Sequence, residues 1–130
     1  MKILIAGGAG YIGTRLSNHL FSLGNDVTVV DLLWFGNYLN KDIHVINKNV
    51  IDMTKEEISK YDVVVFMAGL SNDPMANFSP KTNFIENSAV PTYLAFLSKE
   101  AGVSRFIYAS SCSVYGFTND KIMTEDSLPK

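Results

Sequence analysis

The chain has 130 residues, a net charge of −2, and 47% hydrophobic against 18% charged residues, which suits one soluble compact domain and excludes a disordered tail. The charge gives no general attraction to nucleic acid or to anionic lipid, and no apolar stretch approaches the ~20 residues of a membrane span. Cys112 is the only cysteine, so an internal disulfide is excluded and a reducing, cytoplasmic setting is expected.

The first half of the sequence predicts strands that alternate with helices. Lys2 to Ala6 is a short apolar run stopped by glycine, which is typical of a strand buried on both faces. A helix is predicted over Tyr11 to Leu23, because its apolar residues have helical spacing and Gly24 is placed to end it. A β-branched run predicts a second strand over Asp26 to Asp31, and residues 43–46 predict a weaker third strand.

The second half continues this alternation. Thr54 is expected to begin a short helix with acids in its first turn, and residues 62–67 predict the clearest strand after the first. A serine and a proline begin a helix predicted over residues 79–101, which a glycine ends. Pro91 lies inside this helix and removes one backbone donor, so a kink is expected near Asn87.

A fifth strand is predicted over Arg105 to Ala109, and the polar residues beyond Ser110 predict a loop. Buried strands that alternate with helices indicate parallel strands joined by right-handed crossovers, with helices on both faces. The expected fold is a doubly wound α/β sheet of order 3-2-1-4-5, incomplete at its C-terminal side. Its fifth strand would be an exposed edge, and the isolated chain should self-associate. The long helix should also expose apolar side chains, namely Tyr93, Leu94, Phe96 and Leu97.

A glycine-rich turn joins the first strand to the first helix. Gly7 would permit the tight turn, Gly10 would let a pyrophosphate approach the backbone, and Gly13 would let helix and strand pack closely. The free N–H groups at the start of the helix, at Tyr11 and Ile12, would then face the phosphates. The alternative is a glycine-rich turn that serves packing only.

Asp31 ends the second strand, at the position where dinucleotide-binding proteins carry an acid. A carboxylate there can accept hydrogen bonds from both hydroxyls of the adenosine ribose and would repel a 2′-phosphate. No arginine lies between Asp31 and Asp52, which also favours NAD over NADP. The alternative is an acidic strand end that pairs with solvent or with a lysine.

The glycine spacing resembles that of the short-chain dehydrogenase/reductase superfamily. The remaining motifs are similar to its extended branch, the nucleotide-sugar epimerases and dehydratases, in particular the UDP-galactose 4-epimerase type. The resemblance implies a Rossmann-type fold, NAD as cofactor and a nucleotide sugar as substrate. Its segments are GGAGYIG at 7–13, Asp31, VVFMAGLSNDP at 64–74 and RFIYASSCSVYG at 105–116.

The same resemblance assigns further cofactor-binding positions. Asn49 stands where the family often has an adenine-binding aspartate, and its amide can still hydrogen-bond an adenine edge; Val50 lies beside it. Asn87 matches an asparagine near the nicotinamide half of the cofactor, or alternatively caps the carbonyl left unpaired by Pro91. The residues after the fourth strand would pass under the cofactor: Met67, Ala68, Gly69 and Leu70.

Ser111 matches the family's catalytic serine or threonine, whose hydroxyl would bond the sugar oxygen at the reacting carbon. The alternative is a serine that satisfies a turn at the end of the strand. The family's 4,6-dehydratases typically have Asp and Glu at the next two positions, whereas this chain has Cys112 and Ser113, which disfavours dehydration. Cys112 is interpreted as a small packing residue. No metal site is expected.

The superfamily's acid–base is a tyrosine with a lysine four residues later, and no tyrosine in this sequence has a lysine at that spacing. The family pattern would put this pair just beyond Lys130 and the substrate domain later still. Residues 1–130 are therefore expected to be the N-terminal NAD-binding part of an epimerase, inactive alone. The alternatives are a reductase or dehydrogenase of the same family and a non-catalytic NAD-binding module. A homodimer through the helix over 81–101 is a further expectation.

Overall fold

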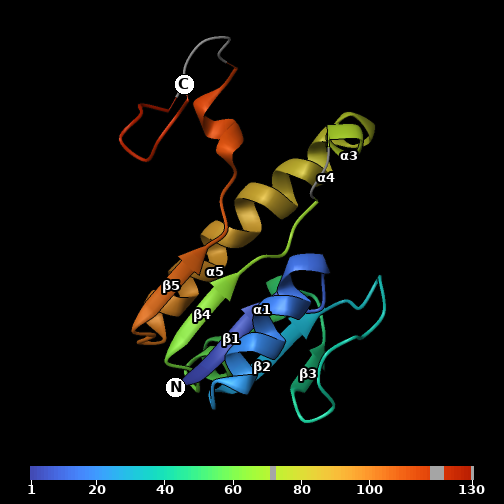
Figure 1. Cartoon of the computed structure of the whole chain (residues 1–130), viewed down its shortest axis with the longest axis vertical. Coiled ribbons are helices and arrows are strands. Elements are labelled where there is room, and N and C mark those ends of the chain that lie inside the picture. The colour runs from blue at the N-terminus through green and yellow to red at the C-terminus, as the bar shows by residue number, and fades with distance from the viewer. Residues whose placement is uncertain (71–72, 118–121, 130) are drawn as a thin grey trace.

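The computed structural model describes residues 1–70, 73–117 and 122–129, in which strands and helices alternate (Figure 1). The strands are β1 (Lys2–Ala6), β2 (Asp26–Asp31), β3 (His44–Asn47), β4 (Val63–Phe66) and β5 (Arg105–Tyr108). The α-helices are α1 (Tyr11–Ser22), α2 (Lys55–Ile58), α3 (Asp73–Phe78), α4 (Pro80–Phe84) and α5 (Val90–Glu100). A π-helical segment, η2 (Ile85–Ala89), joins α4 to α5, and the 3-10 turns are η1 (Val50–Asp52) and η3 (Cys112–Tyr115).

The five strands form one parallel sheet in the order β3-β2-β1-β4-β5, which confirms the predicted topology. β1 lies at the centre, where Ile3 pairs with Val27 of β2 on one side and with Val63 of β4 on the other. Because all strands run the same way, their carboxyl ends lie along one edge of the sheet. The chain reverses its direction of winding between β1 and β4, so a crevice is expected at this point of the edge.

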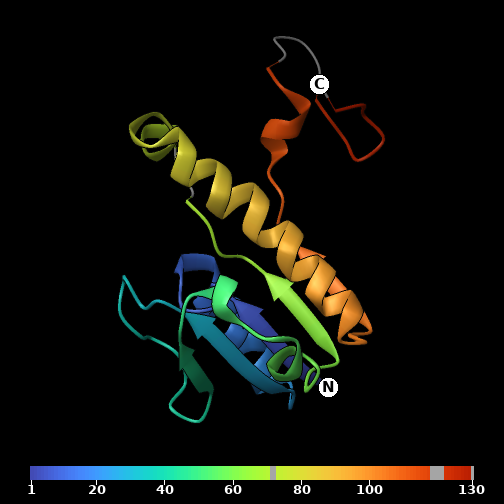
Figure 2. The same cartoon turned by 180° about the vertical axis from the view of Figure 1, so that it is seen from behind.

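The side chains of β1 alternate between two hydrophobic cores, one on each face of the sheet. Leu4 and Ala6 are buried on the face that α5 and α2 cover, whereas Ile3 and Ile5 are buried on the face that α1 covers. Figure 2 shows the long helix lying across the sheet on the side opposite α1. Burial on both faces explains why these strands are continuous apolar runs rather than alternating ones.

The helix predicted over residues 79–101 is distorted around its internal proline. Pro91 has no N–H to donate, so the carbonyl of Asn87, four residues earlier, lacks its α-helical partner. The segment Ile85–Ala89 is π-helical, and the hydroxyl of Tyr108 on β5 donates to the Asn87 carbonyl at 3.2 Å. The irregularity expected near Asn87 is therefore present, as a π-helical segment rather than a simple kink.

The predicted exposure of the long helix is only half right. Tyr93 and Phe96 are exposed, at 45% and 59%, but Leu94 is 1% exposed and Leu97 packs against the core. Leu94 lies one helical turn after Val90 and faces the sheet with it, whereas Tyr93 and Phe96 lie on the outer face. The prediction was wrong for the two leucines because it took an apolar stretch as one surface.

The edge strand agrees with the sequence prediction, whereas several short elements differ from it. β5 is an edge of the sheet as predicted, with Ile107 and Tyr108 nearly half exposed. The short elements α3, η1 and η3 were not predicted, and the third strand lies one residue later than expected, at His44–Asn47. In the described part of the chain, no helix combines the length and apolar character needed to cross a membrane.

Candidate cofactor-binding site

The turn after β1 has a backbone conformation that requires glycine. Gly7 has φ +80°, and its N–H donates to the carbonyl of Val30 on β2 at 2.9 Å. A Cβ atom on Gly7 would lie 2.5 Å from the backbone nitrogen of Ala68, which follows β4. The absence of a side chain therefore brings the turns after β1 and β4 into direct contact, at the point where the sheet changes its winding direction.

The start of α1 is packed tightly onto the same turn. A Cβ on Gly13 would lie 2.8 Å from the Cα of Gly8, and the buried Ser17 hydroxyl donates to the Gly8 carbonyl at 3.2 Å. The residue that caps the helix is Gly10, which has no side chain to bond the first N–H groups, and the first turn carries no acid. These free N–H groups and the positive end of the helix dipole suit an anion such as a pyrophosphate.

Asp31 is bonded to the glycine turn itself. Its Oδ2 accepts the N–H of Ala9 at 3.0 Å, and its Oδ1 accepts the N–H of Leu33 at 2.8 Å. Each carboxylate oxygen has two lone pairs, so both can still accept a hydroxyl. The alternative of a partnership with a lysine is wrong, because the polar partners of this carboxylate are backbone N–H groups.

A cleft opens at the carboxyl edge of the sheet, between the turns that follow β1, β2, β3 and β4; we call it the central cleft. The predicted residues that line it are Gly7, Gly10, Asp31, Asn49, Val50, Met67, Ala68, Gly69 and Leu70. Sequence analysis missed the other lining residues, which are Leu32, Trp34, Phe35, Lys48, Glu86 and Val90. Their position next to predicted site residues could have identified several of them: Leu32 follows Asp31, Lys48 precedes Asn49, and Glu86 precedes Asn87. Val90 lies one helical turn after Glu86.

Five predicted site residues do not line the central cleft. Gly13 is buried and serves the packing described above, while the side chains of Tyr11 and Ile12 are 90% and 65% exposed at the start of α1. These two residues can therefore contribute backbone N–H groups rather than side chains. Asn87 lies on the π-helical segment η2, and Ser111 lies between β5 and η3.

Asn87 holds the turn after β4 in place. Its Oδ1 accepts the N–H of Leu70 and its Nδ2 donates to the carbonyl of Leu70, both at 2.8 Å. Gly69 allows this approach, because a Cβ at that position would collide with the Asn87 amide. The side chain therefore does not cap the carbonyl left by Pro91, which the Tyr108 hydroxyl reaches instead. Asn87 positions the floor of the central cleft.

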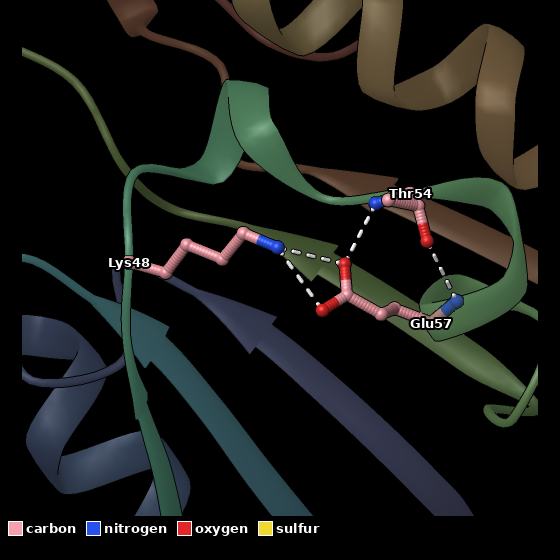
Figure 3. A network of polar contacts seen from close by, with 3 residues as sticks. All are labelled: Lys48, Thr54 and Glu57. Atoms are coloured by element: carbon pink, nitrogen blue, oxygen red, sulfur yellow. Dashed lines mark hydrogen bonds and ion pairs between the residues drawn. The ribbon is translucent and has the colours of Figure 1, made fainter.

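Asn49 and Lys48 connect the central cleft to the two elements that follow β3, which are η1 and α2. Asn49 Oδ1 accepts the N–H of Ile51 at 3.3 Å and so caps η1. Lys48 Nζ donates to both carboxylate oxygens of Glu57, at 3.0 and 2.9 Å (Figure 3). Glu57 and Thr54 form a reciprocal capping box at the start of α2, which confirms that this helix begins at Thr54. The hydrogen bond from the Thr54 backbone, followed by that from Lys48, lowers the pKa of the Glu57 carboxyl.

Ser111 begins the 3-10 turn that follows β5. Its Oγ accepts the N–H of Ser113 at 3.2 Å and donates to the Ser113 hydroxyl at 3.0 Å, and the residue is exposed. Cys112 is also exposed, so its interpretation as a packing residue is wrong. In Figures 1 and 2 this segment extends from β5 away from the sheet. Among the described residues, no group of three or more His, Cys, Asp or Glu could hold a metal ion.

The residues of the central cleft have the groups that a dinucleotide requires. Gly7 and Gly10 line the central cleft without side chains of their own, the start of α1 has no side-chain cap on its N–H groups, and Asp31 offers a carboxylate at the end of β2. This arrangement defines a dinucleotide-binding α/β protein. A sequence profile of the NAD dependent epimerase/dehydratase family matches residues 3–130, and the chain belongs to that family.

Individual relatives are similar over nearly the whole chain. The UDP-glucose 4-epimerase of Lactobacillus helveticus is 30% identical over 139 residues, covering 98% of this chain and 40% of that protein. UDP-glucuronic acid decarboxylase 1 of Danio rerio is 30% identical over 122 residues, covering 88% of this chain and 28% of that protein. The chain therefore spans well under half the length of the curated relatives it matches.

Solved structures have the same fold. The UDP-N-acetylglucosamine 4-epimerase of Methanobrevibacter ruminantium M1 superposes with a TM-score of 0.87 at 26% identity, covering 98% of this chain and 44% of that one. TunA, described as an NAD-dependent NDP-hexosamine 5,6-dehydratase, superposes with a TM-score of 0.89 at 28% identity, covering 100% of this chain and 44% of that one. MoeE5, solved with UDP-glucose and NAD, gives a TM-score of 0.86 at 28% identity over 100% of this chain and 42% of that one.

Proposed function

We propose that residues 1–130 form the NAD-binding part of a nucleotide-sugar epimerase. The observation that carries the proposal is the bond from the Ala9 N–H to Asp31 Oδ2, which joins the phosphate-binding turn to the ribose-binding acid at 3.0 Å. One rigid unit thereby presents a helix N-terminus for the pyrophosphate and a carboxylate for the ribose hydroxyls.

In this proposal, the remaining residues contact different parts of the cofactor. Asn49 and Val50 bind the adenine edge from the turn after β3, and the chain from Met67 to Leu70 forms the floor under the cofactor. Asn87 acts on this floor through the backbone of Leu70. The chemistry that NAD supplies when bound is the uptake of a hydride from a sugar ring carbon and its return to the opposite face.

Ser111 is proposed as the catalytic serine of this chain. Its hydroxyl is exposed just beyond the end of β5 and would hydrogen-bond the sugar oxygen at the reacting carbon. Support comes from its position in the YASS segment and from the accessible Oγ, whose present partners belong to a local turn. The substrate class is a nucleotide sugar, as in relatives solved with UDP-glucose. A cytoplasmic location and a homodimer are part of the same proposal.

Epimerisation is favoured over dehydration by the residues after Ser111. Water loss from a sugar requires an acid and a base at the reacting carbons, and Cys112 and Ser113 supply no carboxylate. A reductase or dehydrogenase of the same family is the second candidate. It differs by a net change of absorbance at the reduced nicotinamide band during turnover, whereas an epimerase leaves the total amount of NAD unchanged.

Calorimetry with NAD and with NADP tests the proposal directly. We expect NAD to bind to the folded chain, and to bind more tightly than NADP because Asp31 repels a 2′-phosphate. Equal or tighter binding of NADP would contradict the assignment of Asp31. A chain that binds neither dinucleotide would contradict the proposed function as a whole. Assay of the chain with UDP-sugars is expected to give no epimerisation, because no tyrosine carries a lysine at the catalytic spacing.

A further inference from the structure

Lys48 follows β3, and its backbone lies next to that of the ribose-binding acid, Asp31. Its backbone N–H donates to the Asp31 carbonyl at 3.3 Å, at the point where β2 and β3 end together. Lys48 and Asp31 both line the central cleft. A lysine in this place is the kind of residue that would attract an additional phosphate, and it works against the repulsion that Asp31 provides.

The ammonium of Lys48 is held by Glu57. Both carboxylate oxygens of Glu57 accept from Lys48 Nζ, at 3.0 and 2.9 Å, and Figure 3 shows the lysine side chain extended toward α2. Glu57 is itself fixed, because Thr54 donates its N–H to Oε2 at 2.8 Å and accepts the Glu57 N–H at 3.2 Å. The carboxylate that holds Lys48 is thus anchored by a helix cap.

Glu57 does not line the central cleft, whereas Lys48 does. Among the residues that the structure describes, the charged ones in this lining are Asp31, Glu86 and Lys48, and the ion pair with Glu57 neutralises the lysine. The net charge next to the ribose position is consequently negative. A dinucleotide with an additional 2′-phosphate is disfavoured on this account, beyond the effect of Asp31 alone.

We propose that Glu57 is a positioning residue for cofactor choice: it holds the Lys48 ammonium away from the ribose 2′ position and thereby maintains the preference for NAD over NADP. This inference rests on the proposed function, since it concerns the same cleft. It assigns a role to Glu57, which does not itself line the central cleft. It also explains why a lysine can stand beside Asp31 without reversing the preference.

The variant Glu57→Gln removes the negative charge of Glu57 and keeps the helix cap, because glutamine can form the capping box as glutamate does. Calorimetry gives the ratio of the NADP and NAD dissociation constants for the wild type, Glu57→Gln, Lys48→Gln and the double variant. We expect Glu57→Gln to reduce this ratio by roughly threefold to tenfold, through tighter NADP binding by the released lysine. Lys48→Gln and the double variant should share one ratio, at least as large as that of the wild type.

Thr54→Ala is the matched control, since it removes the hydroxyl that accepts the Glu57 N–H but keeps both charges and the backbone N–H that donates to Glu57 Oε2. Its ratio should equal that of the wild type. Circular dichroism and thermal melting of each variant separate a folding defect from a binding effect. An unchanged ratio in folded Glu57→Gln overturns the inference, as does a change that persists when Lys48 is also replaced. If the wild type binds neither dinucleotide, the proposed function fails and this inference fails with it.

Discussion

The turn after β1 and the segment after β5 both begin at the carboxyl edge of one sheet, but they are held in different ways. Gly8 and Ala9 in the turn and Gly13 in α1 are buried, and hydrogen bonds with β2 and α1 converge on the turn. Ser111 is exposed, and within the described part of the chain its side-chain bonds reach Ser113 alone, two residues away.

This contrast indicates that the two regions of the site have different roles. The turn after β1 receives its shape from the surrounding fold, so the cofactor-binding surface is built before any ligand arrives. The segment after β5 has its shape from a local turn, so the orientation of Ser111 is open to whatever binds beside it. Substitutions in the first region should therefore change stability and binding together, whereas those in the second should leave stability unchanged.

The largest effect is expected from Gly7→Ala. A Cβ there would lie 2.5 Å from the Ala68 nitrogen, at a φ of +80° that disfavours any side chain. We expect about 3 kcal/mol lower unfolding free energy and loss of NAD binding. Gly24→Ala is the control: its φ is +81° but nothing lies within 4 Å of the new Cβ. It should lower the unfolding free energy by about 1 kcal/mol, measured by urea denaturation. Equal losses for the two variants would contradict the role of close packing.

Asp31→Ala comes next, because it removes both a charge and two acceptors of backbone N–H groups. The preference for NAD over NADP should narrow by about 1–3 kcal/mol in calorimetry. Asp62→Asn is the matched control, since Asp62 also accepts a backbone N–H, that of Lys2, but at the opposite end of the sheet. It should leave the preference unchanged, and a similar narrowing in both variants would indicate a non-specific charge effect.

Asn87→Ala should loosen the turn after β4, because both bonds to the Leu70 backbone are lost. We expect about 1–2 kcal/mol lower unfolding free energy, faster hydrogen exchange at the Leu70 amide and weaker NAD binding. Asn18→Ala is the control: the Asn18 amide also bonds the backbone of a loop, at Tyr38 and Asn40. It should lower stability without changing NAD affinity. If Asn87→Ala left the Leu70 amide protected, the positioning role would be wrong.

Two serines provide the most direct test of the contrast. Ser17 is buried and donates to the Gly8 carbonyl, so Ser17→Ala should lower the unfolding free energy by about 1 kcal/mol. Ser111→Ala should change it by less than about 0.5 kcal/mol and leave NAD affinity unaltered. Denaturant titration of both variants measures the difference. A larger loss for Ser111→Ala would show that the segment after β5 is held by the fold as firmly as the first turn.

The smallest effect is the pH dependence of the Lys48–Glu57 pair. The pKa of Glu57 is lowered by the Thr54 backbone and by Lys48, so its contribution to stability is present at neutral pH. It should be lost as the pH falls below the ordinary glutamate value of about 4.3 and through the lower folded pKa. The stability difference between wild type and Glu57→Gln should be a few tenths of a kcal/mol at about pH 6. A difference that stayed constant on acidification would contradict this assignment.

The sequence by itself determined the elements and their order. Apolar runs that are too continuous for a half-exposed strand predicted a sheet covered on both faces, and the glycine turn with Asp31 located the cofactor-binding edge. Capping signals at Thr54 and Ser79 fixed where two helices begin. The apolar runs, the glycine turn and the capping signals are short-range patterns, which depend on residues only a few positions apart. Asp31 was located by its position at the end of the second predicted strand.

The tertiary structure alone decided which distant groups meet. Asn87 bonds Leu70, 17 residues away, and Tyr108 supplies the donor that Pro91 withholds from the helix, 21 residues from its acceptor. Lys48 was predicted neither as a cleft residue nor as the partner of Glu57, because a lysine side chain can adopt many orientations and only the folded position of Glu57 selects one. Contacts of this kind depend on how the crossover connections place one turn against another. The spacing of residues along the chain does not predict that geometry.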